Sequence, residues 1–246
     1  MESAITIILT IFVLFLIVAQ HRNNQRNRKW QWEETISSNR EQIESVTALN
    51  RGTWSERDLV LELLKNGFKP GAIFHDLYLR KSGGHHTQID LVLATSVGLI
   101  IFEVKDYSGW IFGKGNQSQW TQVLAYGRDK YRFYNPVFQN KKHIEDLRKQ
   151  SKQFNNLPMF SVIVFYGNCQ LRDISFIPNG TYITTARRVL YAVDQIIQDN
   201  PPANYTDKHE IIRILRNAVE NGAAPEIQEQ HAQTIHDMLG KDRIFD

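Results

Sequence analysis

Cysteine is nearly absent from this sequence: Cys169 is the single cysteine among 246 residues. One cysteine excludes an intramolecular disulfide framework and a four-cysteine zinc site. Such sparing use of cysteine is typical of a protein that works in a reducing compartment. We therefore interpret Cys169 as a small buried residue that follows a strand.

The sequence also has little excess charge of either sign. A net charge of +3 is too small to indicate nucleic-acid binding by itself, so any basic surface must be local. Internal repeats and low-complexity tracts are missing as well. Hydrophobic residues make up 42% of the chain and aromatic residues 11%, which supports a packed core in one domain with extensions.

Charge is missing altogether from residues 4–19. As a helix, this apolar segment would span about 24 Å, which flanking residues and local bilayer thinning can match to a membrane core of about 30 Å. A cleaved signal peptide is the alternative. It requires a basic start and a small residue near the cleavage site, whereas the chain has Glu2 and Ile17 there. We predict a transmembrane anchor over residues 1–21.

The residues after this anchor are basic: His21, Arg22, Arg26, Arg28 and Lys29. No acidic residue lies between the apolar segment and Glu33. Because positive flanks stay in the cytoplasm, we predict a single-pass inner-membrane protein with its N-terminus outside and its large domain in the cytoplasm. A nucleic-acid patch is the alternative interpretation of the basic run, but its position beside the anchor favours a role in topology.

The rest of the chain alternates between strand and helix patterns, with a polar helical segment over residues 30–49 before them. Strands are expected at 72–80, 88–95, 98–105, 109–113, 118–124, 130–134, 159–166 and 182–185. Helices are expected at 53–67, 136–154, 186–199, 206–220 and 225–239. This order predicts an α/β fold in which a mixed β-sheet is flanked by helices. The predicted regions are an anchor (1–21), a basic helical linker (22–50), an α/β domain (51–185) and a C-terminal helical region (186–246).

Charged residues stand at the ends of two of the apolar strands. Asp90 lies in one strand, and Glu103 and Lys105 end the next. Burying such charges costs several kcal/mol unless they are paired. Side chains two apart in a strand share a face, so Glu103 and Lys105 point the same way. Two carboxylates with one ammonium suit a hard divalent cation and an activated water, although an isolated Glu-x-Lys is more often a solvated surface pair.

Further residues join these three in a fixed order. In chain order the set is Glu56, Gln88-Ile89-Asp90, Glu103-Val104-Lys105, Gly109-Trp110-Ile111, Trp120, Asn135-Pro136-Val137-Phe138-Gln139-Asn140, His143 and Leu147. This set, spread over residues 52–152, resembles the nuclease-related domain, a branch of the PD-(D/E)xK nuclease-like superfamily. The resemblance implies a restriction-endonuclease-like fold. One departure is Ser55, where the family usually has glycine.

The resemblance also implies a metal-dependent site. Asp90, Glu103 and the backbone carbonyl of Val104 would bind Mg²⁺ or Mn²⁺, for which oxygen ligands are suited. Lys105 would orient or help deprotonate a metal-bound water, with its pKa lowered by the metal. Glu56 would hold a water beyond the metal's own ligands or a second metal, and Gln139 would donate to the scissile phosphate or to a ligand carboxylate. The simpler interpretations are an ordinary charged helix residue for Glu56 and a capping residue for Gln139.

Basic residues beside this site are candidates for contact with the phosphate backbone. Arg128 and Lys130 precede the helix that is expected from residue 136, and Lys141 and Lys142 lie within it. Tyrosines interleave with the first pair, so charge and stacking together would favour nucleic acid. The alternative is a solvated charged face without a ligand.

These expectations converge on a membrane-anchored cytoplasmic nuclease that uses Mg²⁺ or Mn²⁺ and acts on DNA. A homodimer would bring two such sites to opposite strands of a duplex. The first alternative is a catalytically inactive module that binds nucleic acid or a protein partner at the membrane. The second keeps the fold and the chemistry but processes RNA.

Overall fold

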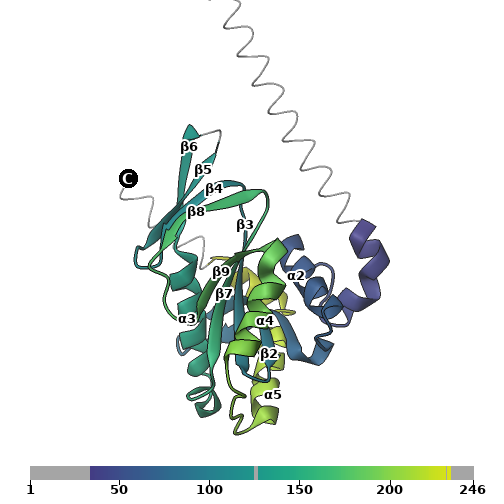
Figure 1. Ribbon diagram of the computed structural model, residues 1–246. Coiled ribbons are helices and arrows are strands. Elements are labelled where there is room, and N and C mark those ends of the chain that lie inside the picture. The colour runs from purple at the N-terminus through teal and green to yellow at the C-terminus, as the bar shows by residue number, and fades with distance from the viewer. Residues whose placement is uncertain (1–33, 125–126, 231, 234–246) are drawn as a thin grey trace, which may run out of the picture.

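A computed structural model describes residues 34–124, 127–230 and 232–233 (Figure 1). The predicted transmembrane anchor lies outside these residues. Within the described ranges, no helix has both the length and the apolar character that a membrane span requires. What the structure describes is a mixed α/β fold with two mixed sheets and flanking helices.

The larger sheet has five strands in the order β1-β2-β3-β7-β9. They are β1 (Ile73–Arg80), β2 (His86–Thr95), β3 (Gly98–Asp106), β7 (Met159–Tyr166) and β9 (Thr181–Thr185). Strands β1, β2 and β3 are antiparallel neighbours, whereas β3, β7 and β9 run parallel. The continuous apolar run of β7 is buried between β3 and β9, as its sequence predicts.

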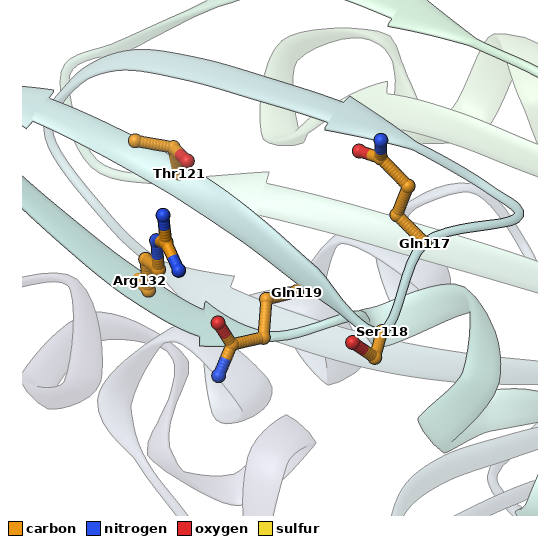
Figure 2. Close-up of a pocket in the computed structure, with 5 residues that line it drawn as sticks. All are labelled: Gln117, Ser118, Gln119, Thr121 and Arg132. Carbon is orange, nitrogen blue, oxygen red and sulfur yellow. The ribbon is translucent and has the colours of Figure 1, made fainter. Parts of the chain in front are cut away.

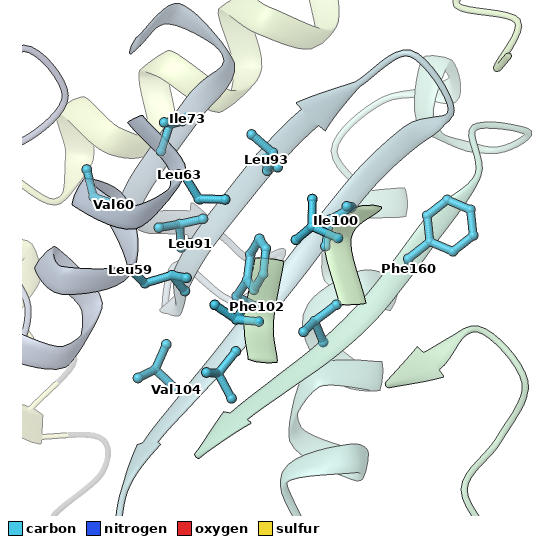
Figure 3. Close-up of a cluster of buried hydrophobic side chains, with 14 of the residues drawn as sticks. Leu59, Val60, Leu63, Ile73, Leu91, Leu93, Ile100, Phe102, Val104 and Phe160 are labelled. Atoms are coloured by element: carbon cyan, nitrogen blue, oxygen red, sulfur yellow. The ribbon is translucent and has the colours of Figure 1, made fainter. Parts of the chain in front are cut away.

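Helices cover both faces of this sheet. On one face lie α2 (Trp54–Lys65) and α4 (Val189–Asp199). Helix α2 buries Leu59 and Leu63 against the strands (Figure 3), and α4 buries Val193 in the same cluster. On the other face lie α3 (Pro136–Arg148) and α5 (Lys208–Asn221), which contribute to a second buried cluster. The apolar residues of β3 alternate between these two clusters, which is the pattern expected for a strand covered on both sides.

A second sheet of four strands continues from the first. Its order is β6-β5-β4-β8, formed by β6 (Asp129–Tyr134), β5 (Gln119–Leu124), β4 (Gly109–Lys114) and β8 (Cys169–Ser175). Its inner face packs Ile111 and Trp120 against Ile163 and Phe165 of β7. The expected single mixed sheet is therefore two sheets.

Strand β8 is a correction to the sequence-based assignment. Residue Cys169 begins this strand and is only partly buried, so it is not the fully buried residue after a strand that we expected. The strand has polar residues and an irregularity in its pairing with β4 between Phe112 and Gly113. Asp173, with φ of 38°, is passed over in that pairing. An interrupted, half-exposed strand lacks the regular alternation by which a strand is found in sequence.

Other element boundaries differ modestly from expectation. Helix α3 ends at Arg148, and the 3₁₀ helix η3 (Lys152–Phe154) follows it. A second 3₁₀ helix, η4 (Ala186–Arg188), precedes α4, and a third, η1 (Pro70–Ala72), precedes β1. The helix expected over 225–239 lies partly outside the described residues, which are helical from 225 to 230.

Residues 34–44 form a helix that packs on the domain. Ile43 is fully buried against Leu61 of α2, and Ile36 and Leu49 pack beside this pair. A little further on, the Thr47 hydroxyl lies 2.8 Å from Nδ1 of His75 in β1. The segment predicted as a linker therefore also carries packing contacts of the folded domain.

Replacing Ile43 with alanine tests how much this packing stabilises the domain. The substitution removes buried methyl groups from a fully enclosed position, so we expect the free energy of unfolding to fall by about 2 kcal/mol or more. Urea denaturation of the full-length protein, followed by tryptophan fluorescence, measures the change. Glu41→Ala, at an exposed position of the same helix, is the control. Equal stability of the two variants would contradict a packed role for the segment.

Candidate active site

A buried ion pair lies at the end of β3. The carboxylate of Glu103 is 1% exposed, and its Oε1 lies 2.5 Å from Nζ of Lys105, whose side chain is 18% exposed. The two residues follow apolar Ile101 and Phe102, which anchor the strand in the two cores. The pair therefore joins a buried acid to a partly accessible amine.

Asp90 lies beside this pair on β2. In the pairing of β2 with β3, Thr95 lies opposite Gly98 at one end and Leu91 lies opposite Phe102 at the other. Just beyond it, Oδ2 of Asp90 accepts a hydrogen bond of 2.7 Å from the backbone N–H of Val104. This bond fixes the Asp90 carboxylate next to the peptide that joins Glu103 to Lys105.

Glu56 is buried at the start of α2. Thr53 caps the helix, and its hydroxyl donates to Oε1 of Glu56 at 2.8 Å, while the Glu56 N–H donates back to that hydroxyl. The other carboxylate oxygen lies 3.3 Å from Nε2 of His75. Gly52, at φ of 60°, lies so close to Glu56 and His75 that a side chain at Gly52 would clash with both. Glu56 is thus more than an ordinary charged residue of the helix, because it takes part in the cap and its carboxylate also contacts a histidine that had no predicted role.

Helix α3 brings two more side chains to the end of β3. Asn135 caps the helix by accepting from the N–H of Val137, and Asn140 donates to the carbonyl of Ile101 at 2.8 Å. These two contacts fix the start of α3 against the sheet. Gln139, one residue before Asn140, accepts a 3.2 Å hydrogen bond at Oε1 from Nζ of Lys105. Asn135, and not Gln139, therefore caps this helix.

His143 is the other side chain that α3 brings to the end of β3, and no role was predicted for it. Its Nε2 lies 3.3 Å from Oε2 of Glu103, and its Nδ1 lies 3.4 Å from the Thr87 hydroxyl. His143 stands one helical turn after Gln139, so both face the end of β3. The separation of 40 residues between Glu103 and His143 explains why no local sequence pattern predicts their contact.

A polar network supports the opposite edge of the site. Gln88 donates to Oδ1 of Asp76 at 2.8 Å, and Arg51 donates to Oδ2 at 3.0 Å and to the Asp76 carbonyl at 2.7 Å. Asp76 has φ of 55°, a strained conformation for a residue other than glycine, and this ion pair is almost fully buried. The network holds β1 just after His75, where Asp76 lies across the ladder from Asp90.

The charges of these groups shift one another's protonation. Burial and the neighbouring carboxylates of Glu103 and Glu56 raise the pKa of Asp90 well above its usual range. Burial also acts to raise the pKa of Glu103, but Lys105 and His143 outweigh it and lower this pKa. Although burial acts to lower the pKa of Lys105, Glu103 and Asp90 raise it, which keeps the amine protonated. A nearby metal would shift the Lys105 pKa in the opposite direction, which is the shift that the family resemblance implies.

The donor set suits a hard divalent cation. Oε2 of Glu103 is buried and lies 3.3 Å from Nε2 of His143 without a hydrogen bond of good geometry, so this oxygen could still serve as a ligand. Burial and the neighbouring carboxylates disfavour the charged form of Asp90, which a cation would stabilise. Within the described ranges, no group of three or more His, Cys, Asp or Glu side chains could hold a metal ion. Magnesium is commonly held by one or two carboxylates with waters and substrate phosphates, and Asp90 and Glu103 fit that pattern.

The predicted nucleic-acid contacts are all exposed. Arg128 precedes β6 and Lys130 lies within it, while Lys141 and Lys142 stand on the surface of α3. Nζ of Lys141 lies 4.0 Å from Glu145, a solvated pair that contributes little to stability. The structure thus places the acidic and amine candidates together at the end of β3 and leaves these four basic residues on the surface.

Comparison with known proteins supports the family resemblance. Residues 51–166 match the sequence model of the family described as the nuclease-related domain. An uncharacterized protein of Bacillus anthracis is 28% identical over 174 residues, which cover 69% of this chain and 76% of that relative. No solved structure matches the chain significantly.

Replacing Lys105 with methionine tests the buried ion pair. The substitution leaves the Glu103 carboxylate almost fully buried without its ammonium partner, so we expect a loss of about 3 to 5 kcal/mol in unfolding free energy. The double variant Glu103→Gln/Lys105→Met removes both charges and is expected to recover most of that loss. Urea denaturation in the presence of a chelator measures both. Additive losses in the double variant would show that the two charges do not stabilise each other.

Proposed function

We propose that residues 51–166, which match the sequence model of the nuclease-related domain, form an active, metal-dependent nuclease that hydrolyses phosphodiester bonds of DNA. The observation that carries the proposal is the cluster at the end of β3. There Asp90 and the buried Glu103 lie beside an amine, with one oxygen of Glu103 available. Most buried carboxylates are fully bonded, so an available oxygen next to a second acid favours a ligand.

The chain's own residues divide the chemistry between them. Asp90 and Glu103 would hold Mg²⁺ or Mn²⁺, together with the Val104 carbonyl. When bound, the cation supplies Lewis acidity toward a phosphoryl oxygen and makes a bound water more acidic. Lys105 would orient that water or neutralise charge that develops on the phosphate, because its Nζ is held between Glu103 and Gln139. Glu56 would act from further away, through its effect on the Asp90 charge.

We propose that α3 positions the acids for this reaction. His143 contacts the Glu103 oxygen that is free for a cation, and Gln139 contacts Lys105. Partners of this kind orient metal ligands and tune their basicity.

The remaining part of the proposal is location: an anchor over residues 1–21 would hold the domain at the inner membrane, on the cytoplasmic side, as the basic residues after it predict.

A binding module without catalysis is the second candidate. It is favoured by one observation, the direct pairing of Lys105 with Glu103, which stabilises the cluster without any ion. In that case the site would be structural and the domain would hold nucleic acid without cutting it. Cleavage assays separate the two candidates.

We expect the full-length protein, purified in detergent, to cut plasmid DNA with Mg²⁺ and not with EDTA. Asp90→Asn and Lys105→Ala are expected to reduce the cleavage rate by at least about a hundredfold, because each removes a group that the reaction requires. Agarose gels with time courses measure the rate. Asp129→Asn and Lys69→Ala, both exposed, are matched controls that keep wild-type activity.

Two results would decide against this mechanism. Undiminished cleavage by the folded Asp90→Asn variant would remove this cluster from the reaction. A wild-type protein that shifts DNA in a gel but never cuts it would establish the binding module.

His143→Ala tests the positioning role separately. We expect a ten- to hundredfold loss of cleavage rate and a higher Mg²⁺ concentration for half-maximal activity, because Glu103 loses the side chain that orients its free oxygen. Titration of the rate with MgCl₂ measures both. His209→Ala, at an exposed position of α5, is the control. A loss of rate with an unchanged Mg²⁺ requirement would contradict an effect through the metal ligand.

A further inference from the structure

The outer face of the second sheet has a composition that the proposed site does not explain. Side chains alternate along a strand, and the inner face is fixed by Ile111 and Trp120, which are buried against β7. The pairing of β4, β5, β6 and β8 therefore assigns every second residue of these strands to the outer face.

Basic and aromatic residues share this outer face. From β4 it presents Trp110 and Lys114, from β6 Lys130, Arg132 and Tyr134, and from β8 Arg172. Among the residues that the structure describes in these four strands, the acidic ones are Asp129 and Asp173. Asp129 immediately precedes the outer-face Lys130 and therefore belongs to the inner face. Asp173 has no partner in the pairing of β4 with β8. The face therefore has positive charge without acidic residues to neutralise it.

Two contacts show that cations and aromatic rings are already close together here. The guanidinium carbon of Arg172 lies 5.5 Å from the centroid of the Trp110 ring, and Nζ of Lys114 lies 5.8 Å from that of Phe176. Tyr134 is 54% exposed and Phe176 66%, although large aromatic side chains are normally more buried. Exposed rings beside cations provide stacking surfaces for bases and charge for phosphates.

A hollow on this face gives the ligand a place to lie. It has a volume of about 490 Å³ and is lined by polar side chains of the β5 and β6 strands and the turn before them: Gln117, Ser118, Gln119, Thr121 and Arg132 (Figure 2). Gln119 pairs with Tyr134 across the two strands, so an exposed ring stands at its edge. Amide, hydroxyl and guanidinium groups of this kind bind base edges and phosphates.

The second sheet follows the proposed active site directly along the chain. Strand β3 carries Glu103 and Lys105 and ends at Asp106, and β4 begins only three residues later at Gly109. From the face's charge, its exposed rings and its polar hollow, we propose that the outer face of the second sheet binds single-stranded DNA.

Single strands are favoured because stacking on side-chain rings requires unpaired bases. A duplex hides its bases and would use the charges alone. The inference rests on the proposed nuclease function for what happens to the strand, but the binding itself can be measured without catalysis.

The test measures binding of a fluorescent twelve-nucleotide dT oligomer to the full-length protein in detergent, with EDTA present to prevent cleavage. We expect the double variant Arg132→Ala/Tyr134→Ala to raise the dissociation constant at least tenfold, because it removes one phosphate contact and one stacking ring. The matched control is Arg188→Ala/Tyr191→Ala on and beside α4, an exposed pair with the Arg188 guanidinium carbon 5.5 Å from the ring centroid. The control is expected to bind within twofold of the wild type.

Salt dependence provides an independent measurement. For single strands, the slope of log affinity against log salt changes by about 0.7 for each phosphate contact. Arg132→Ala and Arg172→Ala are each expected to reduce the magnitude of the slope by about that amount, and Arg188→Ala to leave it unchanged. Circular dichroism confirms folding, which is expected to persist because all these side chains are exposed.

Several outcomes would overturn the proposal: equal weakening by the control pair, tighter binding of a duplex than of the oligomer, tighter binding of an rU oligomer than of dT, or no binding at all. The failure of this proposal is distinguishable from that of the nuclease. A protein that binds dT through this face but never cuts DNA supports the surface and refutes the enzyme. A protein that cuts DNA while Arg132→Ala/Tyr134→Ala binds and cuts like the wild type refutes the surface and supports the enzyme.

Discussion

The ion pair between Glu103 and Lys105 is the constraint on which the site depends. An acid that is almost fully buried at the end of an apolar strand would be strongly unfavourable alone, and the neighbouring amine compensates it. That compensation is incomplete for the cluster as a whole, because burial and the neighbouring Glu103 and Glu56 still raise the pKa of Asp90. A cation beside Asp90 would stabilise its charged form. The arrangement is thus easier to understand as a binding site than as a structural ion pair alone.

The scaffold holds this cluster from three sides. Parallel pairing with β7 holds β3 from Leu99 to Asp106, which includes the stretch that carries the two charges. Asn140 bonds α3 to the carbonyl of Ile101, and this sets Gln139 and His143 over the end of the strand. On the other side, the Thr53 cap and His75 fix Glu56. Immediately beyond the cluster the chain enters the second sheet, so the proposed catalytic and binding surfaces are consecutive along one stretch of backbone.

Local patterns in the sequence predicted much of this fold and failed where pairing is distant. Regular alternation and turns located β1 to β7 and α2 to α5, although α3 ends six residues before the expected boundary at 154, and the resemblance to nuclease-related domains grouped Asp90, Glu103, Lys105 and Gln139. The second sheet was missed because β8 pairs with β4 about sixty residues earlier and is interrupted at Asp173. The contacts of His143 with Glu103 and of Arg51 with Asp76 also join residues with no local relationship. The partial burial of residues 34–49 depends on α2 and is invisible in a polar helical pattern.

The most direct measurement is the location of a divalent cation in crystals of the protein grown with MnCl₂, by anomalous diffraction at the manganese absorption edge. The account predicts one strong peak at coordination distance from carboxylate oxygens of both Asp90 and Glu103, with Lys105 and His143 still adjacent. A crystal in which manganese binds elsewhere, while Lys105 and Glu103 remain paired and the space beside Asp90 holds only water, would contradict it.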